Sequence, residues 1–594
     1  MDHRVYRAAF LPALVALFVL AFSLSDVPKP QTTRKPVLTF DAGRAFGVGK
    51  VLPQNSLNEL VQAFPDRRPG SPGDTGVADR VAAYFMGSKF TNGEPVKRET
   101  VQADTIDGDV PLENVLAVRQ GLSSHTVVVL AHRDAVRGPA AAELSGTAVL
   151  MELARLLAGR DLPKTVMLAS VSGGSGGFAG ARAIVGEAPG PVDAVFDLGD
   201  MAGTTPRRPF VVPYGSGAPA APVSLERTAQ VAVRAELGQN PGRVRGAVQA
   251  IRRVLPLSLS EQGAINDAGA PAVLISNSGE RRPAFDEPIA LDRFEGFGRS
   301  ALRAVTAAVD APAGQPSQRS NGFVLLKRLV PTWAVRLVVL ALLLPALLTA
   351  FDGFFRARRR GMRIGAWTLW AASFALPFAL AWGWARLLDV LGAVQVLPAP
   401  AEGLPVLDSA GWISMASVVV IAVGVGFGIR PLMLRGLGRI GDASAGAAAA
   451  SVGLLLAALT LVVWAFNPYA AAVMLPAAHA WFLIAAPERR PPRLLSIAAV
   501  ATGLVLPAVV LAYYARAWDT GPWTLFNLIS GGALGLGAAL TFSMFAALGC
   551  ATVVILRARR RIVESAPEEP VSTRGPRNYA GPGSLGGTES ALRR

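Results

Sequence analysis

The chain has 594 residues, of which 51% are hydrophobic, and its formal net charge is +16. This length accommodates two or three domains, and so large an apolar fraction predicts several membrane spans. The excess of positive charge does not predict nucleic-acid binding, because arginine clusters flank the apolar runs, as in cytoplasmic loops of membrane proteins. The single cysteine, Cys550, excludes a disulfide framework and a cysteine-based zinc site.

An apolar run near the N-terminus, residues 8–25, follows Arg4 and Arg7. Segments of this kind are signal anchors or cleaved signal peptides. The run is long for the core of a signal peptide, and no clear cleavage site with small residues follows it. We therefore predict a transmembrane signal anchor over residues 1–25.

The segment 40–315 has dispersed charges and alternates short β-rich runs with helical patterns. The β-rich runs are 112–118, 126–132, 165–171, 193–198 and 272–276. The helical patterns fall at 55–64, 75–87, 145–158, 178–186 and 291–308. Strands that alternate with helices predict an α/β domain, with a mostly parallel sheet covered by helices on both faces.

Seven further apolar runs predict a helical membrane domain over residues 330–557, which makes eight spans with the first run. They lie at 333–351, 364–385, 410–430, 444–466, 468–486, 494–514 and 532–556. Arginine clusters occur in alternate connections, so the positive-inside bias places both termini in the cytoplasm and residues 40–315 outside. We expect this multi-pass orientation in the plasma membrane, with a disordered cytoplasmic tail over 563–594 that is rich in Pro, Gly and Ser.

The residues best suited to metal binding or catalysis are His132-Arg133-Asp134, at the end of the apolar strand 126–132. Ligands bind at the carboxyl ends of strands in an α/β sheet. An imidazole there can bind a metal ion, and a carboxylate two residues later can orient it. A lone histidine at a strand end is more often not a metal ligand. Whether His132 belongs to a metal site therefore has to be judged from the surrounding segments.

Six other segments occur in a fixed order around this motif. They are Arg68–Gly73 (RPGSPG), Asn114–Ala117 (NVLA), Ser145–Ala148 (SGTA), Gly177–Ala181 (GFAGA), Asp200–Gly203 (DMAG) and Gly269–Val273 (GAPAV). With the His132 motif, this series resembles the M28 family of zinc aminopeptidases over roughly residues 60–310. The resemblance implies the M28 α/β fold and places its site around His132.

The family's site residues match this chain only in part. His132 stands at the position of the first zinc histidine, Asp134 at that of its companion aspartate, and Asp200 at that of the later aspartate. The bridging aspartate corresponds to Ala142, and Glu143 follows it where the family has asparagine. The two neighbouring glutamates, the general base and a ligand, correspond to Gly174 and Ser175, and the last histidine falls near Arg282.

This inventory argues against hydrolysis. A catalytic zinc needs about three protein ligands and an open position, and the matched positions supply two, His132 and Asp200. Gly174 cannot act as the general base that takes a proton from metal-bound water. Glu143 offers a substitute carboxylate, and the guanidinium of Arg282 can take the place of the metal charge and pair with Asp134 or Asp200.

We therefore expect no metal cofactor, or zinc if the site is active. The expected function is that of a catalytically impaired M28-like domain, which binds or scaffolds a peptide, a lipid-linked substrate or a protein partner at a membrane. The order of segments resembles the GAA-type subunit of GPI transamidase. An active membrane-tethered zinc aminopeptidase is the alternative, and a transporter with an appended binding domain is the second. The stretch 173–177 also fits the Gly-x-Ser-x-Gly pattern of serine hydrolases, with Ser175 as nucleophile.

Overall fold

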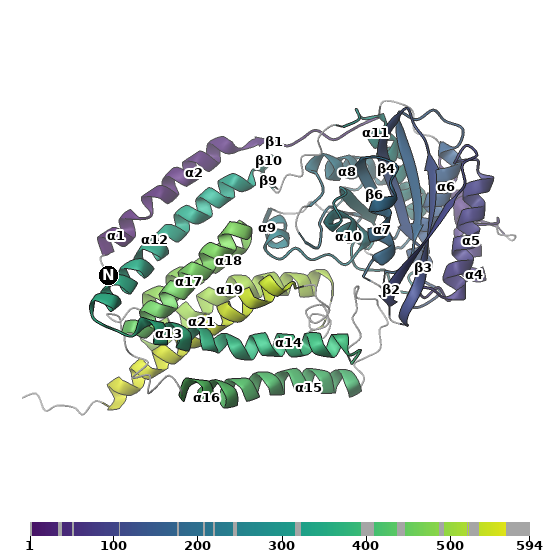
Figure 1. Cartoon of the computed structure of the whole chain (residues 1–594). Helices are drawn as coiled ribbons and strands as arrows, with labels where there is room; N and C mark the ends of the chain where they lie inside the picture. The colour runs from purple at the N-terminus through teal and green to yellow at the C-terminus, as the bar shows by residue number, and fades with distance from the viewer. Residues whose placement is uncertain are drawn as a thin grey trace, which may run out of the picture.

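The computed structural model has two parts, an α/β domain and a group of long helices (Figure 1). It describes residues 3–565 except 34–38, 50–52, 106, 175–176, 206–207, 218–219, 242–245, 315–321, 394–408, 436–445, 486–491, 520 and 522–533. The predicted combination of an α/β fold with several long apolar helices is confirmed. The segment 566–594, which holds most of the predicted tail, lies outside the described residues.

The α/β domain is built on a seven-stranded sheet with the order β2-β3-β5-β4-β6-β8-β7. Its strands are β2 (Lys97–Thr105), β3 (Gly108–Arg119), β4 (Ser123–His132), β5 (Lys164–Val171), β6 (Val192–Leu198), β7 (Phe210–Val212) and β8 (Ala272–Ser276). All five predicted strands are present. Two strands of this sheet were not predicted: β2 is largely polar, and β7 has only three residues.

The sheet is mixed, whereas the sequence predicted it to be mostly parallel. The central strands β5, β4, β6 and β8 are parallel to one another, but β2 pairs antiparallel with β3, β3 with β5, and β7 with β8. The end of β2 and the start of β3 are separated by two residues. So short a connection permits only an antiparallel hairpin, because parallel strands need a long crossover.

Helices cover both faces of the sheet, as predicted. On one face, Val127 and Val129 of β4 face the core formed with α3 (Ala42–Phe46), α4 (Leu57–Ala63), α5 (Pro72–Gly87), α6 (Ala141–Leu157), α8 (Val223–Leu237) and α11 (Leu291–Asp310). On the other face, Val128 and Leu130 pack with α7 (Ala179–Glu187) and α10 (Glu261–Asp267). The apolar strand β4 is therefore central and buried on both sides, which places its carboxyl end at the middle of the sheet edge.

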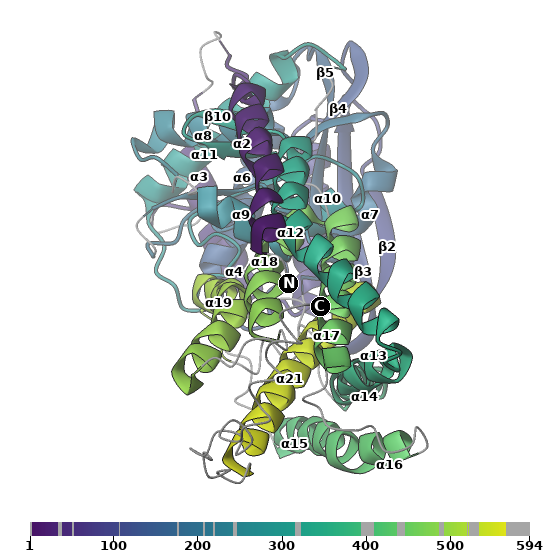
Figure 2. The same cartoon turned by 90° about the vertical axis from the view of Figure 1, so that its left-hand side faces the viewer.

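The other part is helical, and several of its helices are long, apolar and packed against one another (Figures 1 and 2). The helices of this part are α1 (His3–Ala8), α2 (Leu11–Ser23), α12 (Thr332–Arg359), α13 (Ile364–Ala372), α14 (Leu376–Val390), α15 (Ser409–Gly424), α16 (Arg430–Arg435), α17 (Gly446–Phe466), α18 (Pro468–Ala485), α19 (Arg493–Ala517) and α21 (Leu536–Ser565). A 3₁₀ turn joins α13 to α14, and a π turn joins α15 to α16, so each pair forms one long helix.

Seven helices among the described residues are long and apolar enough to cross a membrane. They correspond to seven of the eight predicted spans. The remaining predicted span, 468–486, coincides with α18, which packs between α17 and α19. His479 of α18 lies 2.8 Å from the Tyr6 hydroxyl and 3.0 Å from the Leu342 carbonyl oxygen, so this helix also binds the N-terminal segment and α12. The chain thus has the helices expected of a multi-pass membrane protein.

One end of the helical group faces the α/β domain. A three-stranded sheet of β1 (Ser25–Asp26), β10 (Arg328–Val330) and β9 (Phe323–Leu325) joins the end of α2 to the start of α12. The turn between α17 and α18 contacts the domain through Asn467, whose amide donates to the carbonyl oxygen of Arg253 at 2.8 Å. Beyond the end of α19, Asp519 forms an ion pair with Arg281 at 3.0 Å.

These contacts agree with the alternation of connections inferred from arginine clusters. The connections near 467 and 515–525, predicted on the outer side, are those that contact the α/β domain. Arg358 and Arg359, which are predicted to be cytoplasmic, lie at the opposite end of α12. The connection at 386–409, also predicted on the outer side, lies largely outside the described residues.

The predicted orientation can be tested by cysteine labelling after Cys550→Ser removes the native thiol. Leu122→Cys introduces a thiol on an exposed turn of the α/β domain, and Arg359→Cys introduces one at the far end of α12. In intact cells, a membrane-impermeant maleimide should label only the Leu122→Cys variant, and both variants should react after permeabilisation. Labelling of Arg359→Cys in intact cells would contradict the orientation.

Candidate active site

The candidate site lies at the carboxyl end of β4, in the middle of the sheet edge. His132 is the last residue of β4 and is buried, and Asp134 follows it with no exposed surface. The backbone carbonyl of His132 accepts a hydrogen bond from Thr147 of α6 at 2.8 Å. The carboxylate of Asp134 accepts one from the backbone N–H of Gly174 at 3.0 Å. The motif is thus fixed from both sides.

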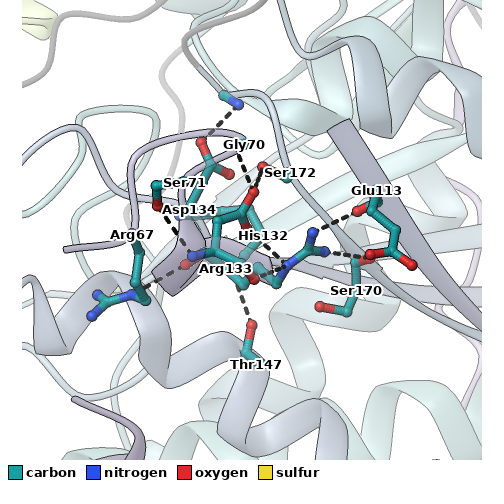
Figure 3. Close-up of polar contacts among 12 residues, drawn as sticks. Arg67, Gly70, Ser71, Glu113, His132, Arg133, Asp134, Thr147, Ser170 and Ser172 are labelled. Carbon is teal, nitrogen blue, oxygen red and sulfur yellow. Dashed lines mark hydrogen bonds and ion pairs between the residues drawn. The ribbon is translucent and has the colours of Figure 1, made fainter. Parts of the chain in front are cut away.

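Arg133 lies between these two residues in the sequence, but its contacts stabilise the fold. Figure 3 shows its guanidinium surrounded by partners from neighbouring strands and from α5. It forms an ion pair with Asp74 at 2.8 Å and donates to the carbonyl oxygens of Ser170 and Glu113. Because a fully buried guanidinium needs its donors satisfied, these bonds hold β3, β5 and α5 around the end of β4.

A second buried arginine, Arg67, supports the loop that leads to α6. It donates to the carbonyl oxygens of Phe64, Arg133, Pro139 and Ala140 at 2.7–3.2 Å. The neighbouring Arg68, which begins the RPGSPG segment, is exposed and pairs with Asp66 and Asp107. Nothing in the local sequence distinguishes the buried arginine from the exposed one.

Arg282 occupies the centre of the site. Its Nη1 lies 3.1 Å from Glu143 Oε1 and its Nη2 lies 3.6 Å from Glu261 Oε1, and all three side chains are buried. The expected partners were Asp134 or Asp200, so the ion pairs go to different carboxylates than predicted. Asp134 remains a charge neighbour of Arg282. We call Arg282, Glu143, Glu261 and His132 the Arg282 cluster.

Gly174 makes room for this arrangement. A Cβ atom at residue 174 would lie only 1.6 Å from Nη2 of Arg282. Real atoms do not approach so closely, so any side chain at this position would have to displace the guanidinium. The absence of a side chain at 174 and the position of Arg282 are therefore linked.

Glu261 is the site residue that sequence reasoning missed. It is the first residue of α10, and its Oε1 lies 3.7 Å from Nδ1 of His132. Burial raises the pKa of Glu261, with Arg282 acting in the opposite direction, and burial also raises the pKa of the neighbouring Asp197. The sequence offered no signal, because α10 has seven residues and no family motif matched there.

Asp200 is held by a turn of its own chain segment. Its Oδ1 accepts hydrogen bonds from the backbone N–H groups of Ala202 at 3.1 Å and Gly203 at 2.7 Å. Burial raises its pKa to about 7, against the lowering effect of these two bonds. The hydrogen bonds of this carboxylate thus go to the turn, whereas Arg282 pairs with Glu143 and Glu261. Ser175, the other matched position, lies outside the described residues.

Burial controls the charge of the Arg282 cluster. It lowers the pKa of His132 to about 3, with Arg282 acting in the same direction, so the imidazole is neutral at neutral pH. It raises the pKa of Glu143 to about 7, and Arg282 partly offsets this rise. At neutral pH the guanidinium therefore compensates carboxylates that burial alone would keep protonated.

Residues 114–251 match the model of peptidase family M28. The matched segment runs from β3 to α9 (Gly246–Val254) and contains His132, Glu143, Gly174 and Asp200. Peptidases of this family usually bind zinc. Within the part of the M28-like domain that the structure describes, no three His, Cys, Asp or Glu side chains are grouped so that they could hold a metal ion.

Solved structures that match part of this chain include aminopeptidases and glutaminyl cyclases. A leucine aminopeptidase precursor from Bacteroides thetaiotaomicron is 15% identical with a TM-score of 0.37, over 46% of this chain and 98% of that chain. LapB from Legionella pneumophila is 14% identical with a TM-score of 0.38, over 50% and 80%. Glutaminyl cyclase from Porphyromonas gingivalis is 16% identical with a TM-score of 0.36, over 45% and 98%. No curated protein matches the chain in a sequence comparison.

Replacing Glu143 by glutamine should change how stability depends on pH. The pKa of Glu143 is about 7 in the folded protein, against an ordinary value of 4.5. The folded state therefore binds the extra proton between these values and loses stability as the pH rises through them. Glu143→Gln removes this contribution, so its melting temperature should fall less than that of the wild type between about pH 5 and about pH 7.

The control is Glu295→Gln on the exposed surface of α11. Its melting temperature should follow the wild-type pH profile. Identical pH profiles for Glu143→Gln and the wild type, measured by scanning fluorimetry in detergent, would contradict the assignment.

Proposed function

We propose that this protein is a multi-pass membrane protein whose M28-like domain lies outside the cytoplasm and binds its target without hydrolysing it. The observation that carries the proposal is the position of Arg282, whose guanidinium fills the space beside Gly174. In the family pattern that position belongs to the general base. A hydrolase that activates water needs a proton acceptor there, and a buried arginine cannot be one.

The donor set around His132 does not suit zinc. A catalytic zinc takes about three protein ligands with the metal at their centre. Here His132 and Glu261 are 3.7 Å apart, but Arg282 lies beside Glu261 at 3.6 Å and pairs with Glu143. A fixed positive charge among the carboxylates supplies the compensation that a metal ion would otherwise give. The ligand-poor sequence and the geometry support the same conclusion.

Binding is the activity that such a domain retains. Hydrogen bonds from Thr147 to the carbonyl of His132 and from Gly174 to Asp134 hold the loops at this sheet edge. The surface around the site therefore has a defined shape. A peptide, a lipid-linked substrate or a protein partner are the ligand classes that this ancestry and the membrane setting favour. We place the protein in the plasma membrane with both termini cytoplasmic, and propose domain limits of 1–25, 40–315, 330–557 and 563–594. The parallel with GPI transamidase rests on this order of segments.

Metal content and peptidase activity of the purified full-length protein test the proposal. We expect no stoichiometric zinc by elemental analysis after incubation with zinc and washing. We also expect no chelator-sensitive hydrolysis of aminoacyl nitroanilides or of N-terminal glutaminyl peptides. An active M28 aminopeptidase, treated in the same way, serves as the positive control.

The His132→Ala variant makes the test specific. Two results would overturn the proposal in favour of an active zinc aminopeptidase. One is the binding of one zinc per chain that is lost in His132→Ala, and the other is chelator-sensitive turnover that this substitution abolishes. Turnover that persists in His132→Ala would indicate a contaminating peptidase and leave the absence of intrinsic activity supported.

A further inference from the structure

The end of α12 that points away from the α/β domain carries a dense group of arginines (Figure 1). Arg358, Arg359, Arg360 and Arg363 lie at the end of this helix and in the short turn to α13, and all four are exposed. We call them the α12 arginine cluster. Four positive charges within six residues produce a strong local field that attracts anions.

Carboxylates do not compensate this charge. Asp352 forms an ion pair with Arg356, one turn before the α12 arginine cluster. Within the described ranges of the chain, no ion pair joins a member of the cluster to an aspartate or glutamate. Arg359 donates to the backbone carbonyl oxygen of Phe355 at 3.4 Å, and this bond leaves its positive charge in place.

The face of α12 that carries these charges also presents aromatic rings. Phe351 is 48% exposed and Phe355 is 52% exposed. Because residues three or four apart lie on the same face of a helix, Phe351, Phe355 and Arg358 form one stripe. Ala350 and Ala357, seven residues apart on a different face, are buried. The stripe therefore faces outward, away from the packed helices.

The length of α12 places the α12 arginine cluster at the depth of lipid headgroups. Trp333, at the start of α12, is 55% exposed, and tryptophan is typical of membrane interfaces. Arg358 follows it by 25 residues, which correspond to about 38 Å of α-helix. A bilayer measures about 40–45 Å with its headgroup regions. With Trp333 at one interface, the cluster lies among the headgroups of the opposite leaflet.

We propose that the α12 arginine cluster binds the phosphate group of an anionic phospholipid in the leaflet remote from the α/β domain, which is predicted to be cytoplasmic. An open hollow of about 650 Å³ is lined by Asp352, Phe355, Arg358 and Arg359. Arginine suits phosphate because its planar fork donates two parallel hydrogen bonds. The rings of Phe351 and Phe355, one and two turns further into the helix, provide the surface on which the acyl chains pack. This inference requires that α12 crosses a membrane, and it does not depend on the Arg282 cluster.

Native mass spectrometry of the full-length protein in detergent can measure this binding. The probes are phosphatidylglycerol, zwitterionic phosphatidylcholine and, as a soluble source of the same phosphate chemistry, glycerol phosphate. The variant Arg358→Gln/Arg359→Gln removes two charges of the cluster. The matched control Arg493→Gln/Arg557→Gln removes two exposed charges from α19 and α21, which are predicted to lie on the same side of the membrane.

The Arg358→Gln/Arg359→Gln variant should bind phosphatidylglycerol at least about tenfold more weakly than the wild type, because each arginine at a membrane surface adds to the attraction for anionic lipid. The control variant should bind it within about twofold of the wild type. The wild type should prefer phosphatidylglycerol to phosphatidylcholine, and millimolar glycerol phosphate should not displace the bound lipid.

Equal losses of affinity in the two double variants would contradict the proposal, because they would indicate a general attraction of this membrane side for anionic lipid. Unchanged affinity in Arg358→Gln/Arg359→Gln, or equal affinity for the two lipids, would also contradict it. Displacement by glycerol phosphate would identify a site for small anions instead. If the double variant does not fold, Arg358→Gln alone replaces it and should weaken binding at least about threefold.

Discussion

The site of this protein depends on one buried positive charge. Arg282 lies among Glu143, Glu261 and Asp134 at the carboxyl end of the central strand. Several carboxylates buried close together need a cation nearby, either a metal ion or a side chain, because ionised groups without a partner are costly inside a protein. The guanidinium fits only because residue 174 has no side chain. The absence of a side chain at residue 174 and the position of Arg282 are thus linked.

The loop that carries Arg282 also connects the site to the membrane helices. Glu280, two residues before Arg282, is buried and forms the ion pair with Arg252. The guanidinium of Arg252 lies 5.2 Å from the ring centroid of Tyr514 and 5.7 Å from that of Trp518. Cation–π contacts of this kind are strongest where water is excluded. The end of α19 therefore helps to hold the loop that carries Arg282.

Much of the fold could be predicted from the sequence, because hydrophobic periodicity depends on local spacing. The buried strand at 126–132 and the helix around Leu150 and Leu153 follow directly from it, as do the apolar spans. The antiparallel edges could not be predicted in the same way. They depend on which strands meet in space, and the polar strand β2 lacks an apolar pattern.

The candidate site could be predicted only where a motif placed a residue. His132, Asp134, Glu143, Gly174 and Arg282 were all selected in this way. The structure brings Arg282 next to Glu143 and Gly174, and their role in a functional site stays a prediction. Glu261 was missed because its role depends on α10 packing against the end of β4, far away in the sequence. The different tasks of Arg133 and Arg67, which bind backbone carbonyls, also depend on tertiary contacts that single residues do not reveal.

The most direct test of this account is a double-mutant cycle between positions 174 and 282, measured by thermal unfolding of the full-length protein. Gly174→Ala places a methyl group where the guanidinium lies, so it should lower the melting temperature in the wild-type background. In an Arg282→Ala background the space is empty, and Gly174→Ala should be nearly neutral. The account predicts a coupling free energy above about 1 kcal/mol, as expected for residues in contact. Additive effects of the two substitutions would contradict it.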